Sequence, residues 1–223
     1  MKVFTAAQHH EVLPAWAEYR RQLDQAPEVL ALDFHTDVLC AARRGVALPP
    51  PDAWQNETAV ALAVSQLHHD EHFDWALRSG MIAKALIISL SPCAVPPEHP
   101  ALEVRRDGNL PDMMTMLNEP EKFYPFAAAV LSDGFLQSQL LDREMPEKGF
   151  IFDIDCDFVL CRKALQPEQH TVFDDLLRRA GLITLSCEND WVKLLQLPGE
   201  NLSGREIAEI LEGYCHALAA PDR

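Results

Sequence analysis

The chain alternates short apolar runs with longer segments of helical pattern, and this alternation limits its fold more than any other feature. Five runs read as strands because they are short and mostly apolar, as strands buried on both faces of a sheet are. Helical segments between strands favour parallel pairing with helices on both faces. At 223 residues, the sequence predicts one three-layer α/β/α domain over residues 1–223, with a mainly parallel sheet. The predicted strands span residues 2–8, 28–34, 83–90, 149–155 and 182–188.

The helical segments carry the usual boundary signals. In the second of them, His68 and His72 are spaced to share one face. The order H-E-x-x-H is absent, so we interpret these histidines as lying on a solvated helix face. A break in the helix near these histidines remains an alternative. Asn56 is interpreted as a helix cap, with a substrate contact by Asn56 and Glu57 as the alternative. The predicted helices span residues 11–26, 56–80, 125–141, 167–181 and 203–218.

Composition narrows the class of protein. A net charge of −15 argues against nucleic-acid binding, which depends on Lys and Arg neutralising phosphates. No apolar stretch approaches the length of a membrane helix, and the N-terminal residues resemble no signal peptide. Six cysteines are scattered without a C-x-x-C pair, so we expect buried free thiols. We expect a soluble, cytoplasmic protein, and its oligomeric state stays open.

Carboxylates and imidazoles stand where four of the apolar runs end. The carboxyl ends of parallel strands share one rim, where ligands bind, and residues two apart on a strand point to the same side. Carboxylates that converge in a buried place repel one another unless cations neutralise them. The residues concerned are His9 and His10 after the first run, Asp33, His35 and Asp37 after the second, Asp153, Asp155 and Asp157 after the fourth, and Glu188 after the last.

Each of these patterns also has a plain structural interpretation. His9 and His10 suit a surface pair, D-x-H-x-D a loop with helix-capping acids, and D-x-D-x-D a strand-end turn. Because all three stand at the same end of separate parallel strands, a metal centre is favoured. Imidazoles with an excess of carboxylate oxygens suit two manganese ions better than zinc, which seeks thiolates. A non-catalytic domain that binds a structural cation or a cationic partner is the alternative.

Two motifs resemble a known superfamily. "DFHTD" resembles the D-A-H-x-D metal motif of the arginase/deacetylase (ureohydrolase) superfamily, and "FDIDCDF" resembles its second motif, D-x-D-x-x-D. "HHEVLPAW" and "FIFDIDCDF" resemble a compact arginase-like family whose known activity is that of peptide arginases. Those enzymes convert arginine side chains within a peptide to ornithine. The resemblance therefore implies an arginase-like fold and a hydrolase with two manganese ions.

The resemblance also implies a ligand set. The early histidine is His9 by the H-x-E-V-L-P pattern of the compact family, or His10 by the spacing of arginases proper. Asp33 and Asp153 are implied as bridging ligands. The first ion would be held by His9 or His10 with Asp33, Asp37 and Asp153, and the second by His35, Asp33, Asp153 and Asp155.

Two further roles follow from the resemblance. Two cations would activate a water for attack on a guanidinium carbon, with Asp37 carrying the proton to the leaving amine. Glu188 stands where arginases place a glutamate that grips the guanidinium. No counterpart exists of the segment that holds the α-amino and α-carboxyl groups of free arginine, so a guanidino group in a peptide is favoured. A zinc-dependent deacetylase or amidohydrolase of the same superfamily is the alternative enzyme.

Overall fold

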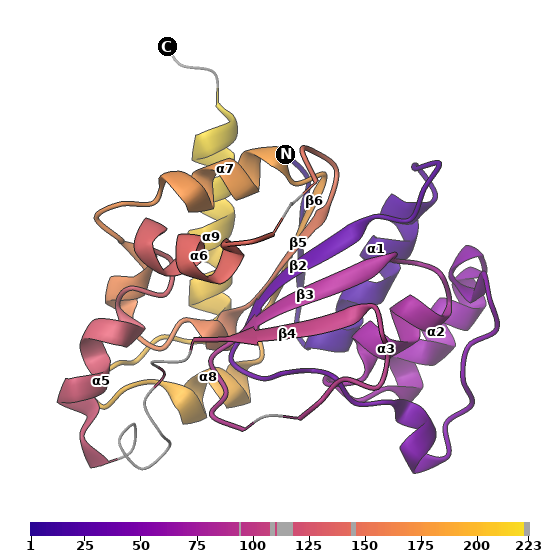
Figure 1. The fold of residues 1–223 in the computed structure, drawn as a ribbon, viewed down its shortest axis with the longest axis horizontal. Coiled ribbons are helices and arrows are strands. Elements are labelled where there is room, and N and C mark those ends of the chain that lie inside the picture. Colours follow the sequence, from indigo (N-terminus) through magenta and orange to yellow (C-terminus); the bar gives the residue numbers. More distant parts are fainter. Residues whose placement is uncertain (94, 108–109, 111–117, 144–145, 221–223) are drawn as a thin grey trace.

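Six parallel strands form the single sheet of the computed structural model, which describes residues 1–93, 95–107, 110, 118–143 and 146–220 (Figure 1). The strand order is β1-β6-β5-β2-β3-β4, and every neighbouring pair is parallel. The predicted parallel sheet is confirmed. The strands are β1 (Val3–Ala6), β2 (Glu28–Asp33), β3 (Lys84–Ser89), β4 (Leu102–Arg106), β5 (Ile151–Asp155) and β6 (Leu182–Ser186).

Helices cover both faces of this sheet, which gives the predicted three layers (Figure 1). One layer holds α1, α2 and α3, and the other holds α5 to α9. The helices are α1 (Leu13–Arg20), α2 (Glu57–Gln66), α3 (His72–Arg78), α5 (Pro120–Ala127), α6 (Asp133–Leu140), α7 (Thr171–Arg179), α8 (Asn189–Leu195) and α9 (Gly204–Ala219). No helix within the described ranges combines the length and the apolar character that a membrane span requires.

The structure divides two of the predicted helices. The segment 56–80 forms α2 and α3, because Leu67 adopts an extended conformation between them. The segment 125–141 falls on α5 and α6, and the Ser132 side chain caps α6 by accepting from Phe135 N. The cap interpretation of Asn56 is confirmed, since its side chain accepts from two backbone amides of α2.

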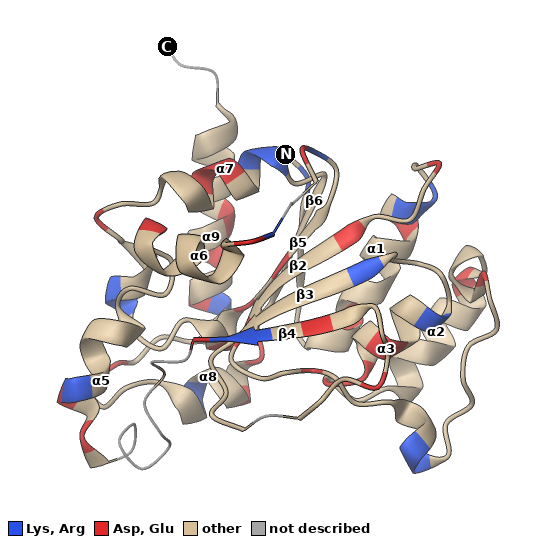
Figure 2. Ribbon diagram, in the orientation of Figure 1, with Lys and Arg blue, Asp and Glu red and all other residues tan. Residues whose placement is uncertain are grey.

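Strand β4 and helix α8 were not predicted from the sequence. Strand β4 lies at the edge of the sheet, where charged side chains are tolerated and obscure an apolar pattern. Helix α8 is one short helix of 7 residues. The prediction of free cysteines is confirmed, as all six are free and five are buried. Figure 2 shows Lys and Arg spread over several helices and strand ends.

Alternation along the central strands divides the core into two faces. On β2, Leu30 and Leu32 pack into the cluster below α5 to α9. Val29 and Ala31 pack into the cluster below α1 to α3. Because successive strand residues point to opposite faces, Asp33 follows Val29 and Ala31 toward the α1–α3 layer. By the same alternation on β5, Asp153 and Asp155 point toward the α1–α3 layer.

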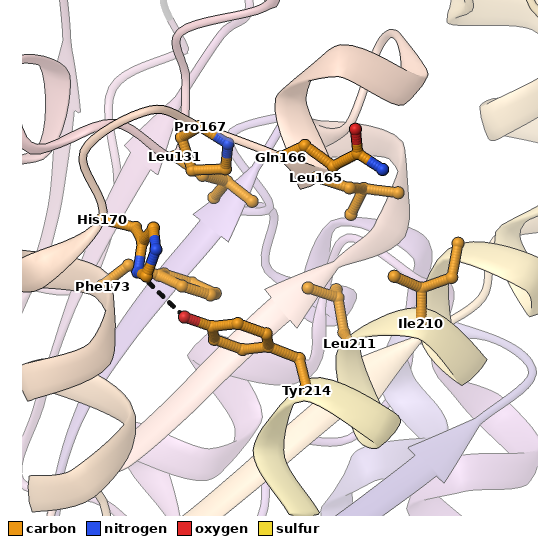
Figure 3. Close-up of a pocket in the computed structure, with 9 residues that line it drawn as sticks. All are labelled: Leu131, Leu165, Gln166, Pro167, His170, Phe173, Ile210, Leu211 and Tyr214. Carbon is orange, nitrogen blue, oxygen red and sulfur yellow. Dashed lines mark hydrogen bonds between the residues drawn. The ribbon is translucent and has the colours of Figure 1, made fainter. Parts of the chain in front are cut away.

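A cavity of about 380 Å³ lies between α7 and α9, in the helical layer on the side of the sheet opposite α1 to α3 (Figure 3). Its walls are mainly apolar, and one end carries the Tyr214 hydroxyl, which lies 2.9 Å from His170 Nδ1 and donates to Asp174. Tyr214 thus joins α9 to the start of α7.

Replacing Tyr214 with phenylalanine is expected to lower the free energy of unfolding by about 1–2 kcal/mol, because His170 and Asp174 lose a partly buried partner. Chemical denaturation of both proteins measures this change. Tyr124 is 41% exposed, so Tyr124→Phe is the matched control and should change little. Equal stability of Tyr214→Phe and the wild type would show that this contact contributes nothing.

An ion pair beside the α2–α3 junction should make stability depend on pH. Glu71 is buried, receives two bonds from Arg44 at 2.7 and 2.5 Å, and accepts from His68 N at 2.8 Å. Burial acts to raise the pKa of Glu71, but the Arg44 bond and the His68 amide outweigh it and lower the pKa. A carboxylate with a lowered pKa stabilises the fold above its ordinary pKa, and this stability is lost as the pH falls below it.

We therefore expect Glu71→Gln to lower the free energy of unfolding at pH 7 by about 1–3 kcal/mol. The difference from wild type should shrink as the pH falls from roughly 5 to 3, where the wild-type carboxylate takes up a proton. Thermal melts across this range measure the difference. Glu57→Gln, at an exposed position, is the control, and a difference that stays constant with pH would contradict the assignment.

Candidate metal centre

The acids predicted to meet do so at the carboxyl ends of the central strands. Asp33 ends β2 and Asp155 ends β5, and the pairing of Leu32 with Ile154 places these two acids side by side. Both are almost fully buried, with exposed fractions of 0% and 2%. Loops and helix starts add the remaining groups, and the cluster faces α1 and α3. The sequence-predicted residues that are buried here are His9, Asp33, Asp37, Asp153, Asp155 and Glu188, while His35 is partly buried.

The His9 ring lies in the middle of the carboxylates. Its Nδ1 atom is 2.8 Å from Asp37 Oδ2, 3.2 Å from Asp155 Oδ2 and 3.5 Å from Asp33 Oδ2. Its Nε2 atom is 2.6 Å from Asp153 Oδ2. His10 forms no ion pair with a carboxylate among the residues that the structure describes. Of the two adjacent histidines, His9 therefore shares the cluster with the acids.

A second group of donors forms around His35. Its Nδ1 atom is 2.8 Å from Asp157 Oδ2 and 3.8 Å from Asp33 Oδ1. His9, Asp33 and Asp155 form one set of atoms within 4.8 Å of one another, and Asp33, His35 and Asp157 form another. The two sets share Asp33, which turns one oxygen to each histidine. Asp157 was not among the predicted ligands, although its position as the third acid of D-x-D-x-D could have identified it.

Two of the acids have a left-handed backbone. Asp37 has φ of 42° and Glu188 has φ of 40°. For residues other than glycine this costs roughly 1–2 kcal/mol, and such strain concentrates at functional sites. Glu188 stands at the start of α8 but does not cap it, and its Oε1 instead accepts from His9 N at 2.6 Å. Glu188 thus fixes the backbone that carries the His9 ring.

His72 is a further member of the cluster that sequence reasoning missed. Its ring centroid lies 4.2 Å from that of His9, and it is fully buried. The prediction of a solvated histidine face is therefore wrong for His72, because the chain turns inward between α2 and α3. His68, by contrast, is exposed. His9, His72 and Asp153 also place donor atoms within 4.8 Å of one another.

Burial and mutual repulsion make it unfavourable for these acids to carry a negative charge. Burial, followed by the charges of Asp37 and Asp157, raises the pKa of Asp33 well above its usual value. Burial and the Asp157 charge do the same to the pKa of Asp155. Burial acts to lower the pKa of His9, but the surrounding carboxylates outweigh it and raise the pKa well above its usual value. The cluster therefore favours an added positive charge.

The residues of this cluster fit a divalent cation, because several of their buried polar atoms lack a hydrogen-bond partner in the described ranges. Nearly all buried polar atoms in folded proteins have a partner. Several buried atoms in this cluster have none within the described part of the chain, and carboxylate oxygens with imidazole nitrogens are the donors that manganese and similar ions take. The unpartnered atoms include Asp33 Oδ2, Asp37 Oδ1, His72 Nε2 and Ser186 Oγ.

A cleft of about 200 Å³ opens beside the cluster. Its lining includes His35 and Asp37 from the cluster, together with His69 and Asp70 from the turn before α3. Trp191 of α8 lies edge-on to His35, with ring centroids 4.6 Å apart. A molecule in this cleft would therefore meet both carboxylates and imidazole rings.

Comparison with known proteins finds a likeness in fold. No protein-family model and no curated sequence matches the chain. The solved structures that it resembles include proclavaminate amidino hydrolase from Streptomyces clavuligerus, at 13% identity with a TM-score of 0.44 over 97% of this chain and 62% of that one. A hypothetical agmatinase from Burkholderia thailandensis is 12% identical, with a TM-score of 0.47 over 97% of this chain and 57% of that one.

The chain thus spans less than two thirds of either of these proteins. At 13% and 12% identity, neither structure assigns a chemistry to this chain.

Proposed function

We propose that this protein is a hydrolase with two divalent cations, preferably manganese, that cleaves a guanidino C–N bond. The observation that carries the proposal is the sharing of Asp33 between two sets of buried donors, one around His9 and one around His35. A carboxylate with one oxygen toward each set suits a pair of ions. The two cations would polarise the substrate and lower the pKa of a water molecule.

The residues of the cluster divide into holding and proton-handling groups. His9, His35 and Asp33 hold the ions together with the acids that follow β5. Asp37 belongs to the cluster and also lines the cleft, with its Oδ2 2.8 Å from His9 Nδ1 and its Oδ1 without a hydrogen-bond partner among the described residues. Asp37 is therefore placed to take a proton from water and pass it to the leaving amine.

The reaction would convert a guanidinium and water into urea and an ammonium group, with the charge conserved. The bond from the guanidinium carbon to the substituted nitrogen breaks, and water supplies the oxygen of urea. A guanidinium carries five donors and one positive charge, which the acids at the cleft would attract. Asp70 lines the cleft and Glu188 lies in the cluster beside His9, so we assign these two acids to substrate binding.

We propose arginine within a peptide as the substrate. The cleft is open to one side of the cluster, and the sequence has no counterpart of the segment by which arginases hold the backbone groups of free arginine. Blocking the α-amino and α-carboxyl groups should therefore not prevent turnover.

The test begins with protein stripped by a chelator and reloaded with manganese or zinc. Elemental analysis gives the metal content per chain, and urea release is measured on free arginine, N-acetyl-arginine amide and short arginine peptides. We expect about two manganese ions per chain and urea from the blocked substrates. The control is the same peptide with lysine at the position of arginine.

Other outcomes separate the alternatives. One zinc per chain with release of acetate from an acetyl-lysine peptide would replace the proposal with the deacetylase. Tight metal binding with no turnover of any guanidine or amide would favour a non-catalytic metal-binding domain. The absence of metal binding would exclude both enzymes.

A further inference from the structure

We infer that Asp155 and Asp157 are the metal ligands in "FDIDCDF", and that Asp153 is a positioning residue that orients His9. This inference rests on the proposed dinuclear site, and it moves the ligand pair two residues along the chain from the pair that the motif implies. Three observations carry it: the strand register, the partners of each carboxylate, and the orientation of the His9 ring.

The strand register determines how far each acid lies from the rim formed by the carboxyl ends of the strands. Asp33, the shared carboxylate, lies beside Asp155 at the ends of β2 and β5. Asp153 pairs instead with Ala31 on one side and Thr184 on the other, two residues further from the rim. Asp157 follows on the other side of Asp155, where it faces His35. The pair that lies level with Asp33 and beyond it is therefore Asp155 and Asp157.

The hydrogen bonds of Asp153 leave neither of its oxygens free. Thr184 Oγ1 donates to Asp153 Oδ1, and His9 Nε2 lies 2.6 Å from Asp153 Oδ2. Trp16 Nε1 in turn donates to Thr184 Oγ1 at 3.2 Å, and all four side chains are fully buried. Asp157 instead faces the second donor set: its Oδ1 accepts from Phe34 N at 3.1 Å, and its Oδ2 lies 2.8 Å from His35 Nδ1, beside Asp33.

These bonds determine which face of His9 is presented to an ion. A proton on Nε2 that is donated to Asp153 leaves the lone pair on Nδ1. Nδ1 is the atom that faces Asp37, Asp155 and Asp33. A carboxylate behind a metal-binding histidine orients the ring and makes it a stronger donor, and its loss typically weakens metal affinity about 10–100-fold. Asp153 fits that role, with Thr184 and Trp16 holding it in place.

The decisive test compares the metal content of three variants: Asp153→Asn, Asp155→Asn and Asp157→Asn. Asparagine at position 153 can still accept from His9 Nε2 through its oxygen, and its amide nitrogen can donate to Thr184 Oγ1. We expect this variant to keep two manganese ions per chain, while the other two variants lose at least one. Elemental analysis and titration against a competing chelator measure the stoichiometry and the affinity.

The opposite pattern would overturn the inference: loss of an ion in Asp153→Asn, with two ions retained in Asp157→Asn. Thr184→Val provides a second test, because it keeps Asp153 but removes the bond that orients it. We expect two ions bound with an affinity about 10–100-fold weaker, and a change in the absorption spectrum of the cobalt-loaded protein. Unchanged affinity and spectrum in Thr184→Val would also count against the positioning role.

These readouts separate this inference from the proposed function. Wild-type protein that binds two ions but hydrolyses no guanidine would refute the function and leave the ligand assignment intact. Hydrolysis by the wild type combined with ion loss in Asp153→Asn would refute the assignment alone.

Discussion

Replacing Asp33 with asparagine is expected to abolish the binding of both ions and to lower hydrolysis by roughly a thousand-fold or more, equivalent to about 4 kcal/mol of transition-state stabilisation. The reason is its shared position, with Oδ2 facing His9 and Oδ1 facing His35. Asparagine keeps an oxygen that can accept from His35 N, as Asp33 Oδ1 does at 2.6 Å. Metal content by elemental analysis and urea release together measure the effect.

The metal-free variant should be no less stable than the metal-free wild type. Burial and the neighbouring acids disfavour the charge of Asp33, so its removal relieves repulsion. Manganese should raise the melting temperature of the wild type, since a ligand that binds only the folded state stabilises it, and this increase should vanish in Asp33→Asn. Asp24→Asn, at an exposed acid, is the control. Retention of two ions in Asp33→Asn would refute its bridging position.

The largest expected effect on stability comes from Gly204→Ala. Gly204 is the first residue of α9, and a Cβ atom there would lie 1.6 Å from the Cys187 carbonyl oxygen. The obstacle is backbone, so the chain itself must shift, at a cost of about 3 kcal/mol. For a domain of this size we expect the melting temperature to fall by roughly 6–12 °C. Because Glu188 follows Cys187, the shift should also displace the residue that binds His9 N and weaken metal binding.

Gly213→Ala is the matched control in the same helix. A Cβ atom at Gly213 meets no atom within 4 Å among the described residues. Alanine stabilises helix interiors relative to glycine, so we expect a gain of about 0.5–1 kcal/mol. Thermal melts of the two variants should therefore shift in opposite directions. A Gly204→Ala protein as stable as the wild type would mean that α9 does not pack as closely on Cys187 as the structure shows.

Local pattern accounts for most of the fold. Short apolar runs such as residues 28–34 and 182–188 predict strands, because a strand buried on both faces needs apolar side chains on both. The edge strand β4 is the exception, since its Glu103 and Arg105 remain partly exposed and carry no such pattern. The division of residues 56–80 into two helices depends on the conformation at Leu67, which local propensity does not dictate.

The residue pattern alone predicts that acids and histidines gather at one rim, because parallel strands end on the same side and their ends carry these residues. Contacts between distant parts of the chain establish which of these residues meet. The choice of His9 over His10 depends on the turn before α1, and the pairing of Asp155 with Asp33 depends on strand register. The burial of His72 depends on the packing of α3. Register and helix packing join residues far apart in the chain, whereas a sequence pattern records only neighbours.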